Sequence, residues 1–423
     1  QVGDSGAGEL TEADIEQLAG QPPIVRFVNV VLAQAIRGKA SDIHFEPFEH
    51  DFQIRYRIDG ALYQMAPPPR NLALPIISRL KVIADLNIAE RRLPQDGRIK
   101  IRLENNEVDI RVSVIPMLHG EAVVMRLLRQ SSALRGMKEL GLDAHELKSF
   151  RRVLGLPHGI ILVTGPTGSG KTSTLYTALN EINDAVRKII TIEDPIEYQL
   201  KGINQIQVSE KAGLTFARGL RSILRHDPDV ILVGEIRDQE TAQIAVQASL
   251  TGHLVFSTLH TNDAPGALTR LVDMGVEPYL VASSLEAVLA QRLVRVLCPQ
   301  CKQEDTSAPT QSFKAQLGFP AETRIFRAVG CRECRQTGYH GRRAIFEWMD
   351  SDNELRQLIL KNVSSDVLRE AARRAGMKSL SEDGWRLVRA GVTTPEEVLR
   401  VTKDQSIGVG TEEPLVAAES PDI

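Results

Sequence analysis

The chain has few aromatic residues, no long apolar run and almost no net charge. Phe, Trp and Tyr make up 4% of its 423 residues, too few for the stacking platforms that bind single-stranded nucleic acid. Its 51 basic residues nearly balance 54 acidic ones, which argues against a large polyanion-binding surface. No segment approaches the ~20 apolar residues of a membrane span, and the N-terminus lacks a signal-peptide core. We therefore expect a soluble, cytoplasmic protein that does not bind nucleic acid.

Cysteine is also scarce, but its four residues are paired. They form two C-x-x-C motifs, Cys298 with Cys301 and Cys331 with Cys334, separated by 29 residues. Each pair can supply two thiolates from one tight turn, and two pairs complete a tetrahedral shell suited to Zn²⁺. A redox role fits less well, because a catalytic C-x-x-C normally occurs once, at the start of a helix. The sequence therefore predicts a structural zinc site with these four ligands.

The most specific pattern is a phosphate-loop motif. Residues 165–172, Gly-Pro-Thr-Gly-Ser-Gly-Lys-Thr, match G-x-x-x-x-G-K-[ST] between a predicted strand at 160–164 and a predicted helix at 172–180. Glycines let backbone N–H groups point at phosphates, Lys171 brings positive charge to the β- and γ-phosphates, and the Thr172 hydroxyl ligates Mg²⁺. The expected nucleotide-binding residues are Gly165, Pro166, Thr167, Gly168, Ser169, Gly170, Lys171, Thr172 and Ser173.

Hydrophobic patterning divides the chain into seven segments. We predict a flexible lead-in at 1–21, an α+β domain at 22–130, a linker at 131–145, an α/β core at 146–297, a zinc-binding segment at 298–341, a helical region at 342–404 and a disordered tail at 405–423. In the small domain, helical spacing runs from Ile24 to Ile36, a strand covers 52–58, and a second helix ends near Leu86. A hairpin (98–103 with 108–114) and a strand at 122–128 follow.

In the core, strands are predicted at 160–164, 188–193, 229–234 and 253–259, in the rhythm of a parallel α/β sheet. After Cys334 we expect helices, for example at 364–375 and 395–403. Carboxyl ends of parallel strands meet at one edge of a sheet, where ligands bind. Glu235, Glu193 and His260 follow or end three of these strands, so an acid there can orient a water against the γ-phosphate. Taken singly, Glu193 and His260 could each equally be an ordinary residue, whereas the nearby phosphate loop favours a functional role for Glu235.

Two groups of arginines are further candidates. Arg218, Arg221 and Arg225 share one helical face, which is either a solvated stripe or a phosphate contact. Arg111 lies on the polar face of its strand, where it could reach a neighbouring subunit.

Gly234 stands where many phosphate-loop proteins carry Asp, so Mg²⁺ would depend more on Thr172, phosphates and water.

Together these motifs resemble the hexameric secretion ATPases of the GspE type, which drive type II secretion and share their superfamily with type IV pilus assembly ATPases. The resemblance covers residues 22–405 and rests on 40–47, 94–98, the phosphate loop, 193–197, 233–238, 253–263 and the paired cysteines. It implies a RecA-like ATPase core with an N-terminal PAS-like α+β domain, ATP with Mg²⁺, and a homo-hexamer. It also implies inner-membrane secretion-platform partners that hold the protein at the membrane periphery. The family has a further N-terminal docking domain, so the chain looks truncated.

The same resemblance assigns roles to residues. Glu235 would be the catalytic glutamate, with Glu193, His253 and His260 close by and Lys171 on the phosphates. The expected phosphate-contacting arginines are Arg111, Arg126, Arg221 and Arg225.

The leading hypothesis is an ATPase motor for pseudopilus assembly and export by type II secretion. A type IV pilus assembly ATPase shares every motif and remains the alternative. A nucleic-acid translocase is disfavoured by the near-neutral charge, and a non-hydrolysing adaptor by the intact Lys171 and Glu235. The zinc motif favours type II secretion, because a retraction-type pilus ATPase ordinarily lacks it.

Overall fold

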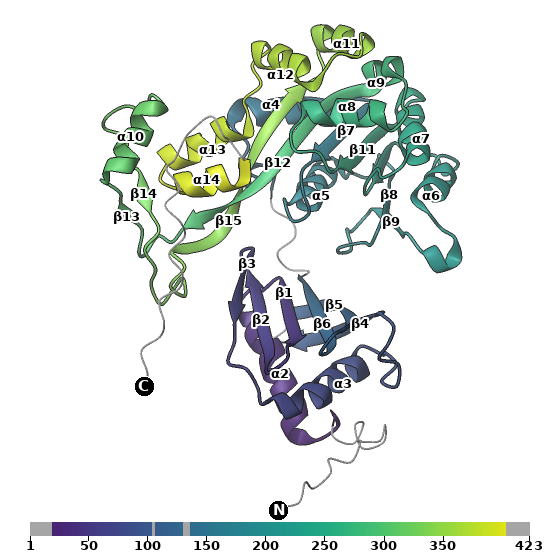
Figure 1. The fold of residues 1–423 in the computed structure, drawn as a ribbon. Coiled ribbons are helices and arrows are strands. Elements are labelled where there is room, and N and C mark those ends of the chain that lie inside the picture. The colour runs from purple at the N-terminus through teal and green to yellow at the C-terminus, as the bar shows by residue number, and fades with distance from the viewer. Residues whose placement is uncertain (1–18, 104–105, 130–135, 403–423) are drawn as a thin grey trace, which may run out of the picture. The chain divides into compact units, whose positions relative to one another are not determined.

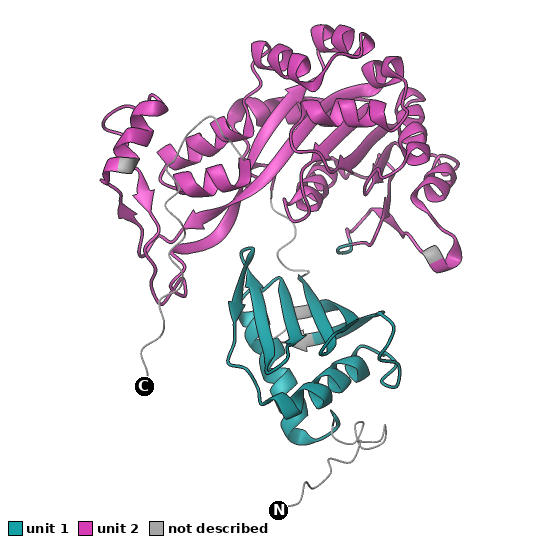
Figure 2. Cartoon of the chain, in the orientation of Figure 1, with its two compact units in different colours: residues 1–134, 197–199 teal, residues 135–196, 200–423 magenta. Residues whose placement is uncertain are grey.

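The computed structural model describes residues 19–103, 106–129 and 136–402. The chain divides into two compact units, residues 1–134 with 197–199 and residues 135–196 with 200–423 (Figure 2). Most of the expected lead-in, the first part of the expected linker and the expected disordered tail lie outside the described residues.

Unit 1 is a six-stranded antiparallel sheet with helices on its apolar face (Figure 1). The strands, in the order β3-β2-β1-β6-β5-β4, are β1 (Asp42–Pro47), β2 (Phe52–Ile58), β3 (Ala61–Gln64), β4 (Gln95–Leu103), β5 (Asn106–Met117) and β6 (Gly120–Arg129). The helices are α2 (Pro22–Arg37), η1 (Arg70–Leu72) and α3 (Ala73–Ile83). Alternate strand side chains point into one core with α2 and α3, the α+β architecture expected of this region.

Unit 1 differs from the sequence-based prediction in several places, including the start of β4 at Gln95 rather than Arg98. The short strands β1 and β3 were not predicted, although Ile43 and Phe45 alternate with polar residues and are fully buried. The second helix ends at Ile83 rather than near Leu86. Asp85 takes a left-handed conformation, with φ of 57°, which an α-helix cannot contain.

Unit 2 is built on a seven-stranded sheet in the order β15-β12-β7-β11-β10-β8-β9. Its strands are β7 (Gly159–Thr164), β8 (Ile189–Glu193), β9 (Asn204–Gln207), β10 (Val230–Val233), β11 (Leu254–Leu259), β12 (Leu285–Leu297) and β15 (Tyr339–Asp350). All neighbouring pairs are parallel except β12 with β15. The four predicted core strands are confirmed to within one residue at each end. Fully buried apolar side chains fill β7, β10 and β11, as in a sheet covered on both faces.

Helices connect these strands. They are η2 (Met137–Glu139), α4 (Ala144–Leu154), α5 (Lys171–Ile182), η3 (Glu210–Ala212), α6 (Phe216–Ile223), α7 (Gln239–Leu250), α8 (Pro265–Asp273) and α9 (Pro278–Ser284). Four more follow the sheet: α11 (Asn353–Leu360), α12 (Ser365–Arg374), α13 (Leu380–Arg389) and α14 (Pro395–Thr402). The last two predicted helices, at 364–375 and 395–403, are confirmed.

The expectation that only helices follow Cys334 is wrong. β15 comes first, and its residues pair with β12 from Ala287 to Leu297. Neither strand was predicted, because the apolar runs in 285–297 and 344–349 lack turn residues and fit a buried helix as well as a strand. The zinc-binding segment is therefore inserted in the sequence between β12 and β15, two paired strands of the core sheet.

The interrupting segment carries β13 (Gln303–Glu304), α10 (Ala308–Gln316) and β14 (Phe326–Arg327). In Figure 1, the paired strands β12 and β15 form a long two-stranded ribbon that extends from the sheet toward this segment. Phe313 and Ile325 of this segment share a small core with Trp385, Val388 and Val398 of α13 and α14. The segment is thus anchored on the C-terminal helices. None of the helices in the described part of the chain combines the length and apolar character needed to cross a bilayer.

Candidate nucleotide site and metal centre

The phosphate loop joins β7 to α5, as the motif predicted. Gly165, Gly168 and Gly170 have φ angles of 146°, 79° and 92°, conformations that residues with a side chain rarely adopt. The Lys171 ammonium donates hydrogen bonds to the carbonyls of Gly165 (2.7 Å) and Pro166 (3.1 Å). The loop therefore curls around a lysine at the N-terminus of α5, which suits an anion.

Two features of the loop fit a bound phosphate group. The Ser169 hydroxyl is buried and has no hydrogen-bond partner among the described residues, although buried hydroxyls normally have one. Burial lowers the pKa of Lys171 to about 8, although nearby Glu235 acts to raise it. A phosphate would accept a hydrogen bond from the Ser169 hydroxyl and bring negative charge to the desolvated Lys171 ammonium. Thr172, the expected Mg²⁺ ligand, is half-buried at the first turn of α5.

Glu235 follows β10 at the same sheet edge as the phosphate loop. Its carboxylate forms an ion pair with Arg237 (2.5 Å) and lies 3.2 Å from the His260 ring nitrogen Nε2. The side chain is 15% exposed, so it is sheltered but open to a small molecule such as water. The structure thus brings Glu235 and His260 together, as the strand-end argument predicted.

Glu193 ends β8 and is almost fully buried. Its carboxylate accepts hydrogen bonds from the hydroxyls of Tyr176 and Thr191 (2.5 Å to the latter) and from the Gln205 amide at 3.2 Å. Both oxygens are satisfied by side chains of α5, β8 and β9. Glu193 therefore ties the phosphate-loop helix to the sheet, and its contacts are those of a positioning group.

The glycine before Glu235 has a steric reason. A Cβ at Gly234 would lie 3.3 Å from the Glu193 Cα and from the Ile192 carbonyl oxygen. Both distances are shorter than ordinary contacts, because β8 and β10 approach closely at this edge. An aspartate at this position would press on the backbone of β8.

The expectation that His253 lies close to Glu235 is wrong. His253 precedes β11, and its carbonyl pairs with the Gly159 amide at the start of β7. His260 follows the other end of the same six-residue strand, seven residues further on, so roughly 20 Å of extended chain separates the two. His253 instead contacts the Ala248 carbonyl at the end of α7, 2.9 Å from its Nδ1.

The core arginines sit on the outer surface of unit 2. Arg221 pairs with Glu240 of α7 at 2.6 Å, and both side chains are more than half exposed. Arg225 follows the helix and donates to the Arg221 carbonyl. Arg221 on α6 and Arg225 just after it are therefore both exposed, a position from which they can contact another molecule.

In unit 1 the arginines form a row across three strands. Arg111 pairs in register with Arg126 on one side and with Arg98 on the other. The three line a hollow of about 460 Å³ together with Asp96, Gly97, Val112, Ser113 and Val124. Arg126 donates to Asp42 at 3.0 Å. The row offers three guanidinium groups on one polar sheet face, accompanied by carboxylates: Arg111 pairs with Glu197 at 3.6 Å, and Asp96 lines the same hollow. The sequence argument named Arg111 and Arg126 but missed Arg98, which the antiparallel register places beside them.

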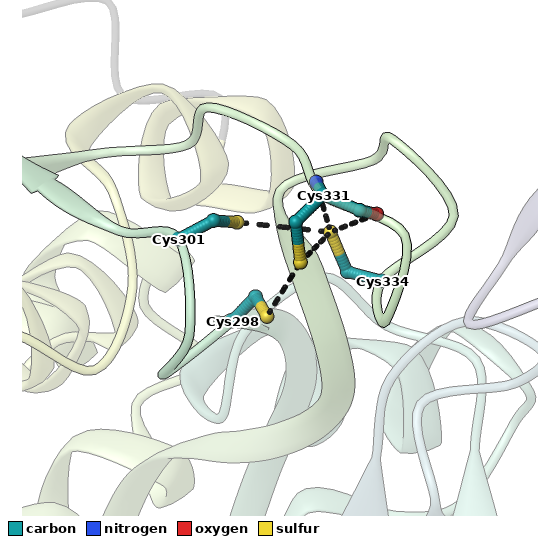
Figure 3. A group of neighbouring side chains, drawn as sticks. All are labelled: Cys298, Cys301, Cys331 and Cys334. Atoms are coloured by element: carbon teal, nitrogen blue, oxygen red, sulfur yellow. Dashed lines mark hydrogen bonds between the residues drawn. The ribbon is translucent and has the colours of Figure 1, made fainter.

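The four cysteines converge as predicted (Figure 3). All sulfur atoms lie within 4.8 Å of one another, and Cys298–Cys331 and Cys301–Cys334 are separated by 3.9 and 3.7 Å. A tetrahedral zinc ion with bonds of ~2.3 Å holds its sulfurs ~3.8 Å apart, so the donor set fits Zn²⁺. Backbone amides of Cys331 and Gly338 donate to the Cys334 sulfur, which stabilises a thiolate there.

The metal centre closes the end of the β12–β15 ribbon. Cys298 follows β12, and its amide donates to the Gly338 carbonyl just before β15. The cluster lies beyond the far end of β12 from the phosphate loop, a position that fits a structural rather than a catalytic metal. A zinc ion here would pin both ends of the 298–338 segment.

We expect freshly purified, reduced protein to contain one zinc ion per chain, and Cys298→Ser to lose it. The melting temperature should fall, because a structural metal contributes directly to folding. Nucleotide affinity should stay unchanged. Arg332→Ala, an exposed position between two ligands, is the control and should keep its zinc. Elemental analysis that finds no zinc in the wild-type chain would show that the four cysteines are not a zinc site.

Comparison with known proteins identifies the family. A family model described as "Type II/IV secretion system protein" matches residues 17–400. The chain belongs to this family. A type II secretion system protein E from Pseudomonas aeruginosa is 53% identical over 93% of this chain and 78% of its own length. A type II secretion system ATPase E from Vibrio cholerae is 51% identical over 92% and 78%.

The type II/IV secretion family also includes pilus proteins. The type IV pilus assembly ATPase PilB from Myxococcus xanthus is 50% identical over 94% of this chain and 72% of its own length. The crystal structure of the pilus retraction motor PilT with bound ADP matches with a TM-score of 0.60 and 26% identity, over 89% of this chain and 97% of that one. The resemblance to secretion ATPases and the RecA-like α/β fold are therefore confirmed.

Proposed function

We propose that this chain is the ATPase motor of a type II secretion system, which hydrolyses ATP to drive pseudopilus assembly and protein export. The observation that carries the proposal is the convergence of the phosphate loop, Glu235 and His260 at one sheet edge. The half-identical type II secretion ATPase E of Vibrio cholerae supports it.

The residues suggest a division of labour. Loop amides and Lys171 bind the β- and γ-phosphates of ATP, and Thr172 provides a ligand for Mg²⁺, which would neutralise charge on the transferred phosphoryl group. Glu235 accepts a hydrogen bond from the attacking water and orients it. His260 and Arg237 hold this carboxylate in place.

The proposed motor works as a homo-hexamer at the cytoplasmic face of the inner membrane, bound there by secretion-platform proteins. Arg111 and Arg126 of one subunit, with Arg221 and Arg225, would complete the phosphate pocket. Two observations support this arrangement: Arg221 is more than half exposed, and the arginine row of unit 1 lines a hollow.

A type IV pilus assembly ATPase is the second candidate, supported by the 50% identity to PilB. Deleting the gene separates the two: loss of secreted enzymes with surface pili intact supports secretion, and the reverse supports pilus assembly.

Nucleotide binding at the phosphate loop has a pH signature. With a pKa of about 8 in the free chain, Lys171 is charged below that pH and loses its proton above it. Since phosphate binds the charged form, ADP affinity should be flat up to pH 7.5 and then fall by up to about tenfold per pH unit. Calorimetric titrations of wild type and Lys171→Ala between pH 7 and 9.5 measure this. The variant should bind weakly without this fall, and equal affinities for both chains would disprove the proposed site.

A further inference from the structure

Gln291 of β12 lies against the phosphate loop on its sheet side. β12 runs parallel to β7, and Ala290 pairs with Thr164, so Gln291 stands beside Gly165, where β7 gives way to the loop. The side chain is 3% exposed. It lies on a strand that carries none of the nucleotide-binding motifs.

Both ends of the Gln291 amide hold the loop region. Its Nε2 donates to the Ser169 carbonyl at 2.8 Å, and its Oε1 accepts from the Thr174 hydroxyl at 2.8 Å. A carbonyl oxygen can only accept, so Nε2 must face Ser169 and Oε1 must face Thr174. One buried amide thereby ties the loop to the first turn of α5.

The bond to Ser169 has a consequence for the next peptide N–H. In a trans peptide the C=O and the following N–H point in opposite directions. Holding the Ser169 carbonyl toward β12 therefore turns the Gly170 N–H away from the sheet, toward the side of the loop that faces a phosphate. Such inward N–H groups are what a phosphate loop offers its ligand.

The loop glycines are packed against the same residue. A Cβ at Gly165 would lie 2.5 Å from the Gln291 carbonyl oxygen, and one at Gly170 would lie 2.7 Å from Nε2. Real side chains essentially never come so close. The absence of side chains at Gly165 and Gly170 therefore allows β12 to pack closely against the loop, in addition to allowing the loop to curl.

We propose that Gln291 is a positioning residue for the nucleotide phosphates: its side-chain amide fixes the Ser169–Gly170 peptide so that the Gly170 N–H meets the β-phosphate. The inference rests on the proposed nucleotide function and assigns a determinant of it to β12. A purely structural glutamine would affect stability alone, whereas this one sets affinity for the diphosphate group.

The test compares ADP with AMP, which has no β-phosphate. Gln291→Leu should weaken ADP binding about tenfold or more, the effect expected when a buried hydrogen-bonding group loses its partner. AMP binding should change far less. Gln291→Glu keeps the acceptor for Thr174 but turns an oxygen toward the Ser169 carbonyl, so it should weaken ADP binding as well.

Two further variants keep the test decisive. Val288→Ala, a buried position on the same strand, should lower the melting temperature without changing the ADP-to-AMP affinity ratio. If Gln291→Leu fails to fold, Thr174→Val removes one anchor of the amide and should give a smaller loss of the same kind. A folded Gln291→Leu with the wild-type ratio would overturn the inference. A wild-type chain that binds neither nucleotide would instead overturn the proposed function.

Discussion

Glu235→Gln should bind ATP with wild-type affinity and hydrolyse it about 10²–10⁴-fold more slowly, the usual contribution of a positioned proton acceptor. The change is isosteric, so contacts with Arg237 and His260 lose charge but not shape. The phosphate loop is not altered. Phosphate release under saturating ATP, with binding measured separately, gives both quantities.

The matched control is Glu181→Gln on α5. Glu181 is a partly exposed carboxylate paired with Arg151 at 3.0 Å, and a surface pair of this kind contributes little. Its turnover should equal that of the wild type. Wild-type turnover by Glu235→Gln itself would show that the catalytic assignment is wrong.

Arg111→Ala should keep nucleotide binding and lose turnover by about 10³-fold or more, as when an arginine finger is removed from other nucleotide hydrolases. Arg126→Ala should act in the same direction. Both guanidinium groups lie in one arginine row of unit 1, whereas the phosphate loop belongs to unit 2. Arg55→Ala is the control, because Arg55 is paired with Glu46 at 2.6 Å on β2 of the same unit.

If a second chain supplies these arginines, specific activity should rise with protein concentration. A constant specific activity over a wide dilution range, with Arg111→Ala unimpaired, would leave both arginines as ordinary surface residues.

Local signals in the sequence predicted much of this site. Glycine, lysine and threonine at fixed spacing define the phosphate loop, and buried β-strand runs located the four central strands, which carry Glu235 and His260 to one edge. The prediction of a four-cysteine cluster required only that the two C-x-x-C turns lie close together, and their sulfur atoms do so. In each case the chemistry depends on residues close in sequence or on the rule that parallel strands share an edge.

What the sequence could not predict depends on pairing between distant segments. Arg98 joins Arg111 only through the register of β4 with β5. Gln291 reaches the loop because β12 joins β7, and the apolar pattern of 285–297 fits a helix as well as a strand. His253 was misplaced because its position was taken from the family resemblance, whereas the whole of β11 separates it from His260.

The most direct test of the account mixes two inactive variants. Arg111→Ala retains Glu235, and Glu235→Gln retains Arg111, so a mixed assembly contains pockets with an intact glutamate from one chain and an intact arginine from another. Phosphate release should reappear on mixing, at a rate well above the sum of the separate variants. Mixtures that stay as inactive as their components, while wild-type chains hydrolyse ATP under the same conditions, would contradict a pocket completed between subunits.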